Sequence, residues 1–210
     1  MITIEPITKD DYGAISTLHE TLLPWSFMAN AGRRFLSAFY DVVMSSQAGF
    51  GYVAKEQGRV VGFALAVYDS RGLLKRLLLA DFFKIIKSLL PVVIKSFSKM
   101  KTLLQLILHR QEKAYRVPSG ECLFIAIDPA IKKGMTFFKL IYAIDKHFLD
   151  RGIKVYHGRV LNTNPVIEVF RRVESFQPVE EISLYGHMWT LYNWSIERSF
   201  KQIKEISENS

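Results

Sequence analysis

The stretch from Glu121 to Phe176 constrains the fold more than any other part of the chain. Residues 122–127 form an apolar run typical of a buried strand, and Asp128-Pro129 ends it. Residues 136–149 then follow as an apolar helix, and residues 154–160 as a second strand. A strand, a loop, a helix and a strand in this order favour a mixed α/β (α+β) domain.

The loop between the first of these strands and its helix carries basic residues and a glycine. It reads Lys132-Lys133-Gly134-Met135-Thr136. The first turn of a helix has unpaired N–H groups, and the helix dipole adds positive potential there, so both favour a phosphate. The sequence therefore predicts an anion site at this loop. The alternative is an ordinary solvated turn.

The remaining segments predict one domain over residues 1–210. We expect a strand at 2–4, helices at 12–22 and 31–44, and an antiparallel hairpin of strands 49–54 and 60–67. Strands at 176–184 and 188–192 and a charged helix at 195–210 complete the order. The chain contains no internal repeat.

Composition excludes several classes of protein. A chain of 210 residues with 49% hydrophobic content is globular rather than disordered. Its single cysteine, Cys122, permits no disulfide framework, and its five histidines lack zinc-site spacing, so we expect no metal. We see no signal peptide and no run of about 18 apolar residues. A cytoplasmic location is the default.

The net charge of +8 is concentrated in one segment, residues 71–116. This segment holds eleven basic and two acidic residues, whereas the rest of the chain is nearly neutral. Its apolar residues recur at helical spacing on both sides of Pro91, with bases off the apolar stripe. We therefore expect an insertion of two basic amphipathic helices, a hairpin joined at Pro91.

Three interpretations of this insertion remain open. Residues 73–110 can attach peripherally to an anionic membrane surface, pack on their own domain, or form a homodimer. Nucleic acid is not expected, because aromatic residues are not interleaved with exposed bases in a stacking pattern.

The whole order of elements, apart from the insertion, resembles the GNAT superfamily of N-acetyltransferases. This resemblance implies a mixed, mostly antiparallel sheet flanked by helices, and acetyl-CoA or coenzyme A as cofactor. In that family a central strand separates from its neighbour, and its exposed backbone binds the pantetheine arm. The resemblance places that strand at Ile125-Ala126-Ile127 and makes Ile125 and Ile127 cofactor-binding residues.

The resemblance also assigns the phosphate loop. Lys132 takes the basic position, with Lys133, Gly134, Met135 and Thr136 following as cofactor-binding residues. Met135 and Phe137 stand where the family has glycines, and Gly134 is one place early.

Two further cofactor-binding positions follow from the same resemblance. Asn164 corresponds to the asparagine before the last helix, although it is also a plain helix N-cap. Phe170 replaces the tyrosine that often protonates the thiolate, and Ser175 replaces a glycine. A phenyl ring has no proton to give.

The implied activity is acetyl transfer to a small-molecule amine. Glu121 is the candidate catalytic base by resemblance; the alternative is an exposed carboxylate at a strand end. Four other residues could face the acceptor or serve structure alone: Trp25, Phe27, Tyr185 and His187. The helical insertion resembles one in GNAT proteins of bacterial surface-polysaccharide synthesis, which suggests an amino sugar. The alternative function is a catalytically silent binding or assembly protein of this fold.

Overall fold

A computed structural model describes residues 1–71, 73–95, 120–131, 133–164, 167, 175–184 and 186–201 of the chain. Seven strands form one sheet in the order β1-β2-β3-β4-β5-β7-β6. Their bounds are β1 Ile2–Pro6, β2 Gly49–Glu56, β3 Arg59–Val67, β4 Glu121–Ile127, β5 Val155–Leu161, β6 Phe176–Leu184 and β7 His187–Ser195. The mixed, mostly antiparallel sheet expected from the sequence is confirmed.

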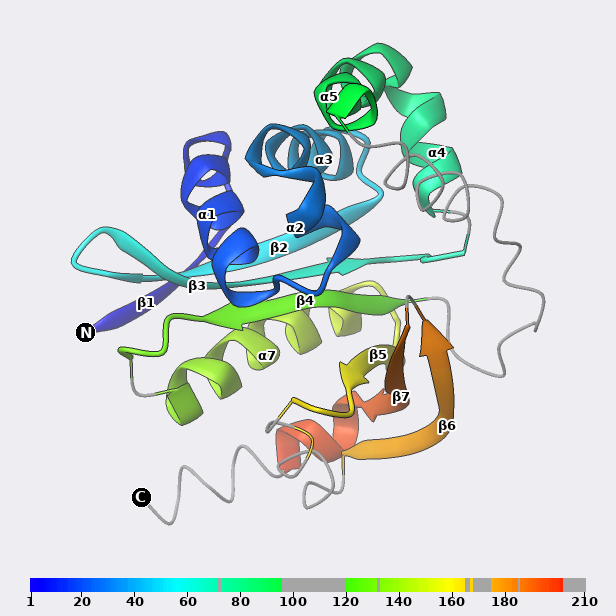
Figure 1. Cartoon of the computed structure of the whole chain (residues 1–210). Helices are drawn as coiled ribbons and strands as arrows, with labels where there is room; N and C mark the ends of the chain where they lie inside the picture. The colour runs from blue at the N-terminus through cyan, green and yellow to red at the C-terminus, as the bar shows by residue number, and fades with distance from the viewer. Residues whose placement is uncertain are drawn as a thin grey trace.

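Helices cover both faces of this sheet (Figure 1). One face carries α1 (Tyr12–Leu22), α2 (Phe27–Ala31) and α3 (Arg33–Ser45), preceded by the 3-10 turn η1 (Lys9–Asp11). The other face carries α7 (Lys133–Asp150). Two further helices, α4 (Leu73–Ala80) and α5 (Phe82–Lys95), lie outside α3.

Each face has its own apolar core. Phe35, Phe39 and Val43 recur at helical spacing on α3 and are buried against β2 and β3. Leu77 of α4 and Ile85 of α5 join the same core. On the opposite face, α7 buries a stripe of its own against the sheet, namely Leu140, Ile141, Ile144 and Phe148. The sheet is therefore buried on both sides where β2, β3 and β4 run.

Among the described strands, one pair of neighbours is parallel. All other pairs are antiparallel, but β4 and β5 run in the same direction because α7 connects them. Their ladder consists of two residue pairs, Glu121 with His157 and Cys122 with Gly158. Beyond these pairs the two strands separate, which confirms the separated central strand expected from the sequence.

Three expectations about helices were wrong in detail. Helix α7 begins at Lys133 rather than near residue 136, so the first turn includes Gly134. The two helices after β3 are divided at Asp81, not at Pro91, which lies within α5. The reason is local capping: the Asp81 carboxylate accepts the backbone N–H of Lys84 at 2.9 Å, so Asp81 starts a new helix.

The third difference is α2, a short helix between α1 and α3 that was not expected. Ser26 makes it possible, because its hydroxyl accepts the backbone N–H of Ala29 and caps the first turn. Residues 96–119, the expected second half of the insertion, lie outside the described residues. Residues 196–201 are helical, and the rest of the expected C-terminal helix is also outside them.

Candidate active site

The separation of β4 from β5 leaves one edge of β4 without a partner strand. Phe124 to Ile127 pair with β3 on one side and with no described strand on the other. An edge strand of this kind offers a row of N–H and C=O groups to any extended ligand that lies beside it.

The hydrogen bond after β4 indicates which groups face this opening. The N–H of Asp128 donates to the carbonyl oxygen of Val61 at 2.8 Å, so Asp128 points toward β3. Successive residues of a strand direct their backbone groups to alternate sides. Ile125 and Ile127 therefore direct their N–H and C=O groups into the opening, while those of Ala126 face β3.

The N-terminus of α7 follows β4 after a tight turn. The carboxylate of Asp128 accepts the N–H of Ala130 at 2.9 Å and so holds the turn. Lys133 and Gly134 occupy the first turn of α7, where backbone N–H groups are unpaired. Thr136 is buried, and Met135 is 53% exposed. Lys132 lies outside the described residues.

Phe137 lies one turn further along α7 and is half-buried. It packs against a small apolar cluster formed by Val160, Ile167 and Tyr192. This cluster contains a residue of β5, so Phe137 closes the α7 side of the region where the strands separate. Asn164 begins the next turn, and its carbonyl accepts the N–H of Ile167 at 3.0 Å. Phe170 is not among the described residues.

Glu121 lies where β4 and β5 still pair, and it is 2% exposed. The expectation of an exposed strand-end carboxylate was therefore wrong. Arg159 donates from Nε to Oε1 of Glu121 at 2.8 Å. His157 Nε2 lies 3.2 Å from Oε2 of the same carboxylate. Both partners reach the same carboxylate because side chains alternate along a strand, which places His157 and Arg159 on one face of β5.

These neighbours control the charge of Glu121. Burial by itself would raise the pKa of the carboxyl, but Arg159 and hydrogen bonds from His157 and Ser70 together lower that pKa to about 2. Glu121 is therefore ionised at neutral pH. With so low a pKa it is a weak proton acceptor on its own.

His157 is a further buried polar group of this cluster. Its side chain is 7% exposed, and its Nε2 faces the carboxylate of Glu121. Within the described part of the chain, Nδ1 of His157 has no hydrogen-bond partner, and neither does Oδ1 of its neighbour Asn193. Buried polar atoms without partners are uncommon unless a ligand or water satisfies them.

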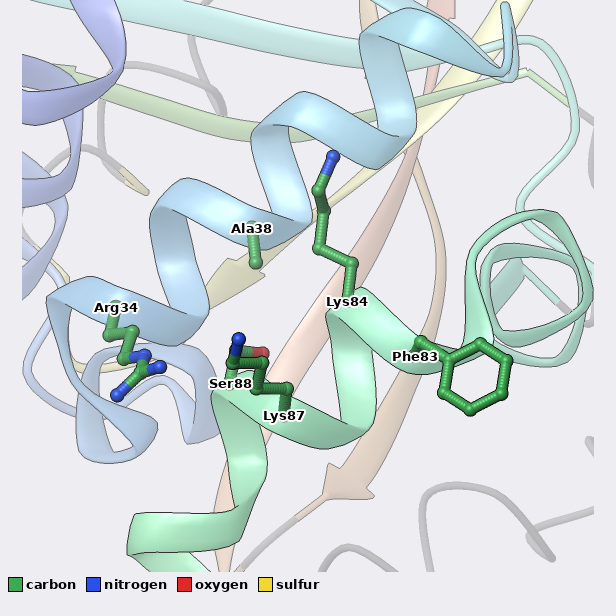
Figure 2. Close-up of a pocket in the computed structure, with 6 residues that line it drawn as sticks. All are labelled: Arg34, Ala38, Phe83, Lys84, Lys87 and Ser88. Carbon is green, nitrogen blue, oxygen red and sulfur yellow. The ribbon is translucent and has the colours of Figure 1, made fainter.

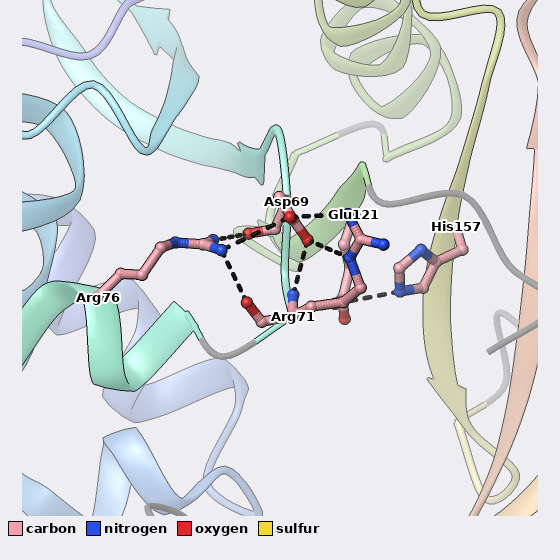
Figure 3. A network of polar contacts seen from close by, with 5 residues as sticks. All are labelled: Asp69, Arg71, Arg76, Glu121 and His157. Carbon is pink, nitrogen blue, oxygen red and sulfur yellow. Dashed lines mark hydrogen bonds and ion pairs between the residues drawn. The ribbon is translucent and has the colours of Figure 1, made fainter. Parts of the chain in front are cut away.

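A second charged network lies in the segment after β3. Asp69 accepts Nε of Arg71 at 2.8 Å, and Arg76 of α4 donates to the carbonyl oxygen of Arg71 at 2.7 Å (Figure 3). Ser70 lies between the first two residues and hydrogen-bonds Glu121. The network therefore fixes the segment that contacts the buried carboxylate.

The loop between α1 and α2 is held by a buried histidine. His19 contacts the hydroxyl of Tyr40 at 2.6 Å and that of Ser26 at 2.9 Å. Burial lowers the pKa of His19 to about 4, so this ring is neutral at physiological pH. Its ring also packs edge-on against Phe124 of β4, with centroids 4.5 Å apart. Half-buried Trp25 lies in this fixed loop.

Sequence reasoning named Glu121 but missed its two partners on β5. His157 and Arg159 alternate on β5, but only the parallel pairing of β5 with β4 shows that they lie beside Glu121. His187, one of the acceptor candidates, is exposed at the start of β7. Tyr185 is outside the described residues, and of Phe27 only its place at the start of α2 is described.

Solved structures that superpose on this chain include N-acetyltransferases. An N-acetyltransferase from Staphylococcus aureus Mu50 superposes with a TM-score of 0.59 at 10% identity, covering 93% of this chain and 99% of that one. A putative acetyltransferase from Salmonella typhimurium, solved with its cofactor acetyl-CoA, gives 0.57 at 14% identity over 93% and 94%. The chain has the GNAT fold.

A third structure with the GNAT fold is equally similar. An uncharacterised protein from Bacillus halodurans gives a TM-score of 0.62 at 14% identity, covering 99% of this chain and 91% of that one. The sequence itself matches no family profile and no curated protein. At this level of identity the GNAT fold is shared, while the chemistry has to be argued from the residues of this chain.

Among the described residues, no group of three or more His, Cys, Asp or Glu side chains is placed to hold a metal ion. No described helix is long and apolar enough to cross a membrane.

Proposed function

We propose that this protein is an acetyl-CoA-dependent N-acetyltransferase acting on a small-molecule amine. The observation that carries the proposal is the unpaired edge of β4, with the backbone of Ile125 and Ile127 directed into the opening. Pantetheine has two amides that can pair with such an edge as an added strand would. The N-terminus of α7, with Lys133 and Gly134, offers N–H groups to the diphosphate.

Acetyl-CoA supplies an activated acetyl group as a thioester. The acceptor nitrogen must lose two protons overall, one to the departing thiolate and one to solvent. We propose that Nδ1 of His157 accepts a proton from the acceptor nitrogen, because this atom has no hydrogen-bond partner among the described residues. Glu121 would orient the ring and stabilise the imidazolium, while Arg159 keeps Glu121 ionised. Phe170 has no proton to give, so the thiolate would receive its proton from water or imidazolium.

An amino sugar is the acceptor we propose first. Trp25 is half-buried in the loop that His19 fixes near β4, and an indole face that is partly exposed can stack on a sugar ring. The acceptor would then approach from the α1–α2 side, the face of the sheet on which Glu121 lies.

The test is an acetyl-transfer assay with amino sugars, polyamines and peptide N-termini as separate acceptor classes. We expect turnover with amino sugars, and loss of turnover in His157→Gln with unchanged binding of coenzyme A. Turnover of another amine class would overturn the acceptor but not the reaction. Binding of coenzyme A without turnover of any amine would overturn the reaction.

A silent binding protein with this fold is the second candidate. It is favoured by Met135 and Phe137, side chains at positions where a glycine would let the backbone approach phosphate closely. Met135 extends into solvent, whereas Phe137 packs inward. If Phe137 blocks the cofactor, the wild type would show no thermal shift with coenzyme A, and Phe137→Ala would restore one.

A further inference from the structure

The outer surface of α4 and α5 exposes large apolar side chains. Leu79 is 78% exposed and Phe83 is 84% exposed, with Phe82 at 54% and Ile86 at 38%. Four such residues within eight positions are unusual for a surface helix, because isolated apolar residues are the norm. This set of four, Leu79, Phe82, Phe83 and Ile86, is called the apolar ridge below.

The apolar ridge is not needed to hold the two helices in place. Leu77, Ile85 and Leu89 point the opposite way and are 0%, 0% and 2% exposed in the core with α3. Their burial already fixes α4 and α5 on the domain. The ridge therefore faces outward as a consequence of how the helices dock.

Basic residues flank the apolar ridge at helical spacing. Lys75 and Leu79 are four residues apart on α4, and Phe83 and Lys87 are four apart on α5, so each lysine lies beside an apolar member on one helix face. Both lysines are exposed. Within the described ranges, neither has an acidic partner.

A cavity of about 380 Å³ opens between α3 and α5 next to the ridge. It is lined by Arg34 and Ala38 of α3 and by Phe83, Lys84, Lys87 and Ser88 of α5 (Figure 2). Lys84 is balanced by Asp41 and Asp81. Arg34 and Lys87 have no acidic partner in the part of the chain that the structure describes, so the cavity has uncompensated positive charge.

We propose that this surface docks on a membrane containing anionic phospholipids. The apolar ridge would enter the boundary between headgroups and acyl chains, and Lys75 and Lys87 would lie at the level of the phosphates. The cavity with Arg34, Lys87 and Ser88 would take one lipid headgroup phosphate. Apolar side chains between free cations match the chemistry of an anionic bilayer, which presents both an acyl layer and negative charge.

This docking does not depend on the proposed acetyl transfer. It would place the enzyme at a membrane surface, which fits an acceptor carried on a lipid. A second copy of this chain is a weaker occupant, because two copies of the surface would bring Lys75, Lys87 and Arg34 against the same unpaired cations.

Sedimentation with vesicles tests the proposal directly. The full chain is mixed with vesicles of phosphatidylcholine alone or of phosphatidylcholine with phosphatidylglycerol. We expect it to pellet with the anionic vesicles only, and less so as salt is added. Each basic residue near an anionic surface contributes about fivefold to partitioning. Lys87→Glu should therefore weaken binding by tenfold or more, and so should Leu79→Ala combined with Phe83→Ala.

Two matched variants serve as controls on other surfaces. Leu149→Ala removes an exposed leucine from the opposite layer, and Lys154→Glu reverses an exposed charge before β5. Both should pellet as the wild type does. All variants change exposed side chains, so their melting temperatures should match the wild type.

Four results would overturn the proposal. One is a wild type that stays in solution with anionic vesicles. Another is Lys87→Glu pelleting as the wild type does. The third is a concentration-dependent dimer that Phe83→Ala dissolves, because the ridge would then be an interface between copies. The last is binding of inorganic phosphate at Lys87 by a protein that does not bind vesicles, because the cavity would then be a site for free anions.

Discussion

Arg159 holds the carboxylate of Glu121 from the neighbouring strand, with Nε donating to Oε1 at 2.8 Å. The pair joins β4 to β5 at the last point where the two strands still hydrogen-bond. It therefore lies at the base of the opening, and it keeps a buried carboxylate charged beside His157. A charge buried there requires such a partner, because its desolvation would otherwise cost several kcal/mol.

Glu121→Gln should lower acetyl transfer without abolishing cofactor binding. The substitution keeps the shape of the side chain but removes the charge that orients and supports His157. General base catalysis contributes roughly 10²- to 10⁴-fold, so we expect kcat to fall about 100-fold. Steady-state kinetics over a range of pH, with the KM for acetyl-CoA, measure this.

The control is Glu180→Gln, which neutralises an exposed carboxylate on β6. It should leave kcat unchanged. If Glu121→Gln retains full activity and the wild-type pH profile, Glu121 has no part in proton transfer and serves the fold alone.

Glu121 should also make the protein sensitive to acid. Its pKa is about 2 in the folded protein and ordinarily 4.5, the value for the unfolded chain, so the unfolded chain binds the proton more tightly. The resulting stabilisation is present above pH 4.5 and is lost as the pH falls toward about 2. The difference corresponds to about 3 kcal/mol in the free energy of unfolding.

Denaturant unfolding across this pH range measures the effect. Glu121→Gln should be less stable than the wild type at neutral pH, because it leaves Arg159 and His157 without their anion. The difference between the two proteins should shrink with acid. A constant difference over the whole range would show that the ionisation of Glu121 contributes nothing to stability.

Asp145 should have the opposite effect on stability. Its carboxylate on α7 accepts the Tyr156 hydroxyl and the Trp194 indole N–H, both at 2.8 Å, and Ser199 at 2.5 Å. Burial outweighs these bonds and raises the pKa of Asp145 from 3.8 to about 7. The folded protein therefore binds this proton more tightly, and stability falls as the pH rises between those values, by up to about 4 kcal/mol.

Asp145→Asn should remove this dependence, because an amide keeps an acceptor oxygen but does not ionise. The variant should gain stability relative to the wild type as the pH rises from about 3.8 to about 7 in denaturant titrations. Asp150→Asn on the same helix breaks an exposed pair with Lys146 and should change little. The raised pKa would be contradicted if the difference in free energy of unfolding between the wild type and Asp145→Asn did not vary with pH.

Periodicity in the sequence was enough to predict the strands of the sheet, whereas the position of the opening was implied by the resemblance to the GNAT superfamily. Residues 122–127 read as a strand because their apolar run is short and ends at Pro129. The break at Asp81 was missed, because the apolar stripe continues through it and Pro91 is a stronger signal by composition. A side-chain cap decided the boundary, and such a cap is visible only once the helix geometry is known.

The site could be predicted only in part, for a similar reason. Ile125 and Ile127 were named because the order of elements resembles the GNAT superfamily, which implies that this strand binds the cofactor. The partners of Glu121 depend on the parallel register that pairs Glu121 with His157, and register is set by long-range packing. Burial of Glu121 follows from the same contacts. Local sequence around residue 121 gives no sign of them.

The central claim is that the free edge of β4 binds coenzyme A, and hydrogen exchange of single backbone amides tests it most directly. The N–H groups of Ile125 and Ile127 face the opening, whereas that of Ala126 faces β3. NMR-detected exchange with and without coenzyme A should show new protection at Ile125 and Ile127, and none at Ala126, which is protected throughout. Unchanged exchange at Ile125 and Ile127 under saturating coenzyme A would contradict the account.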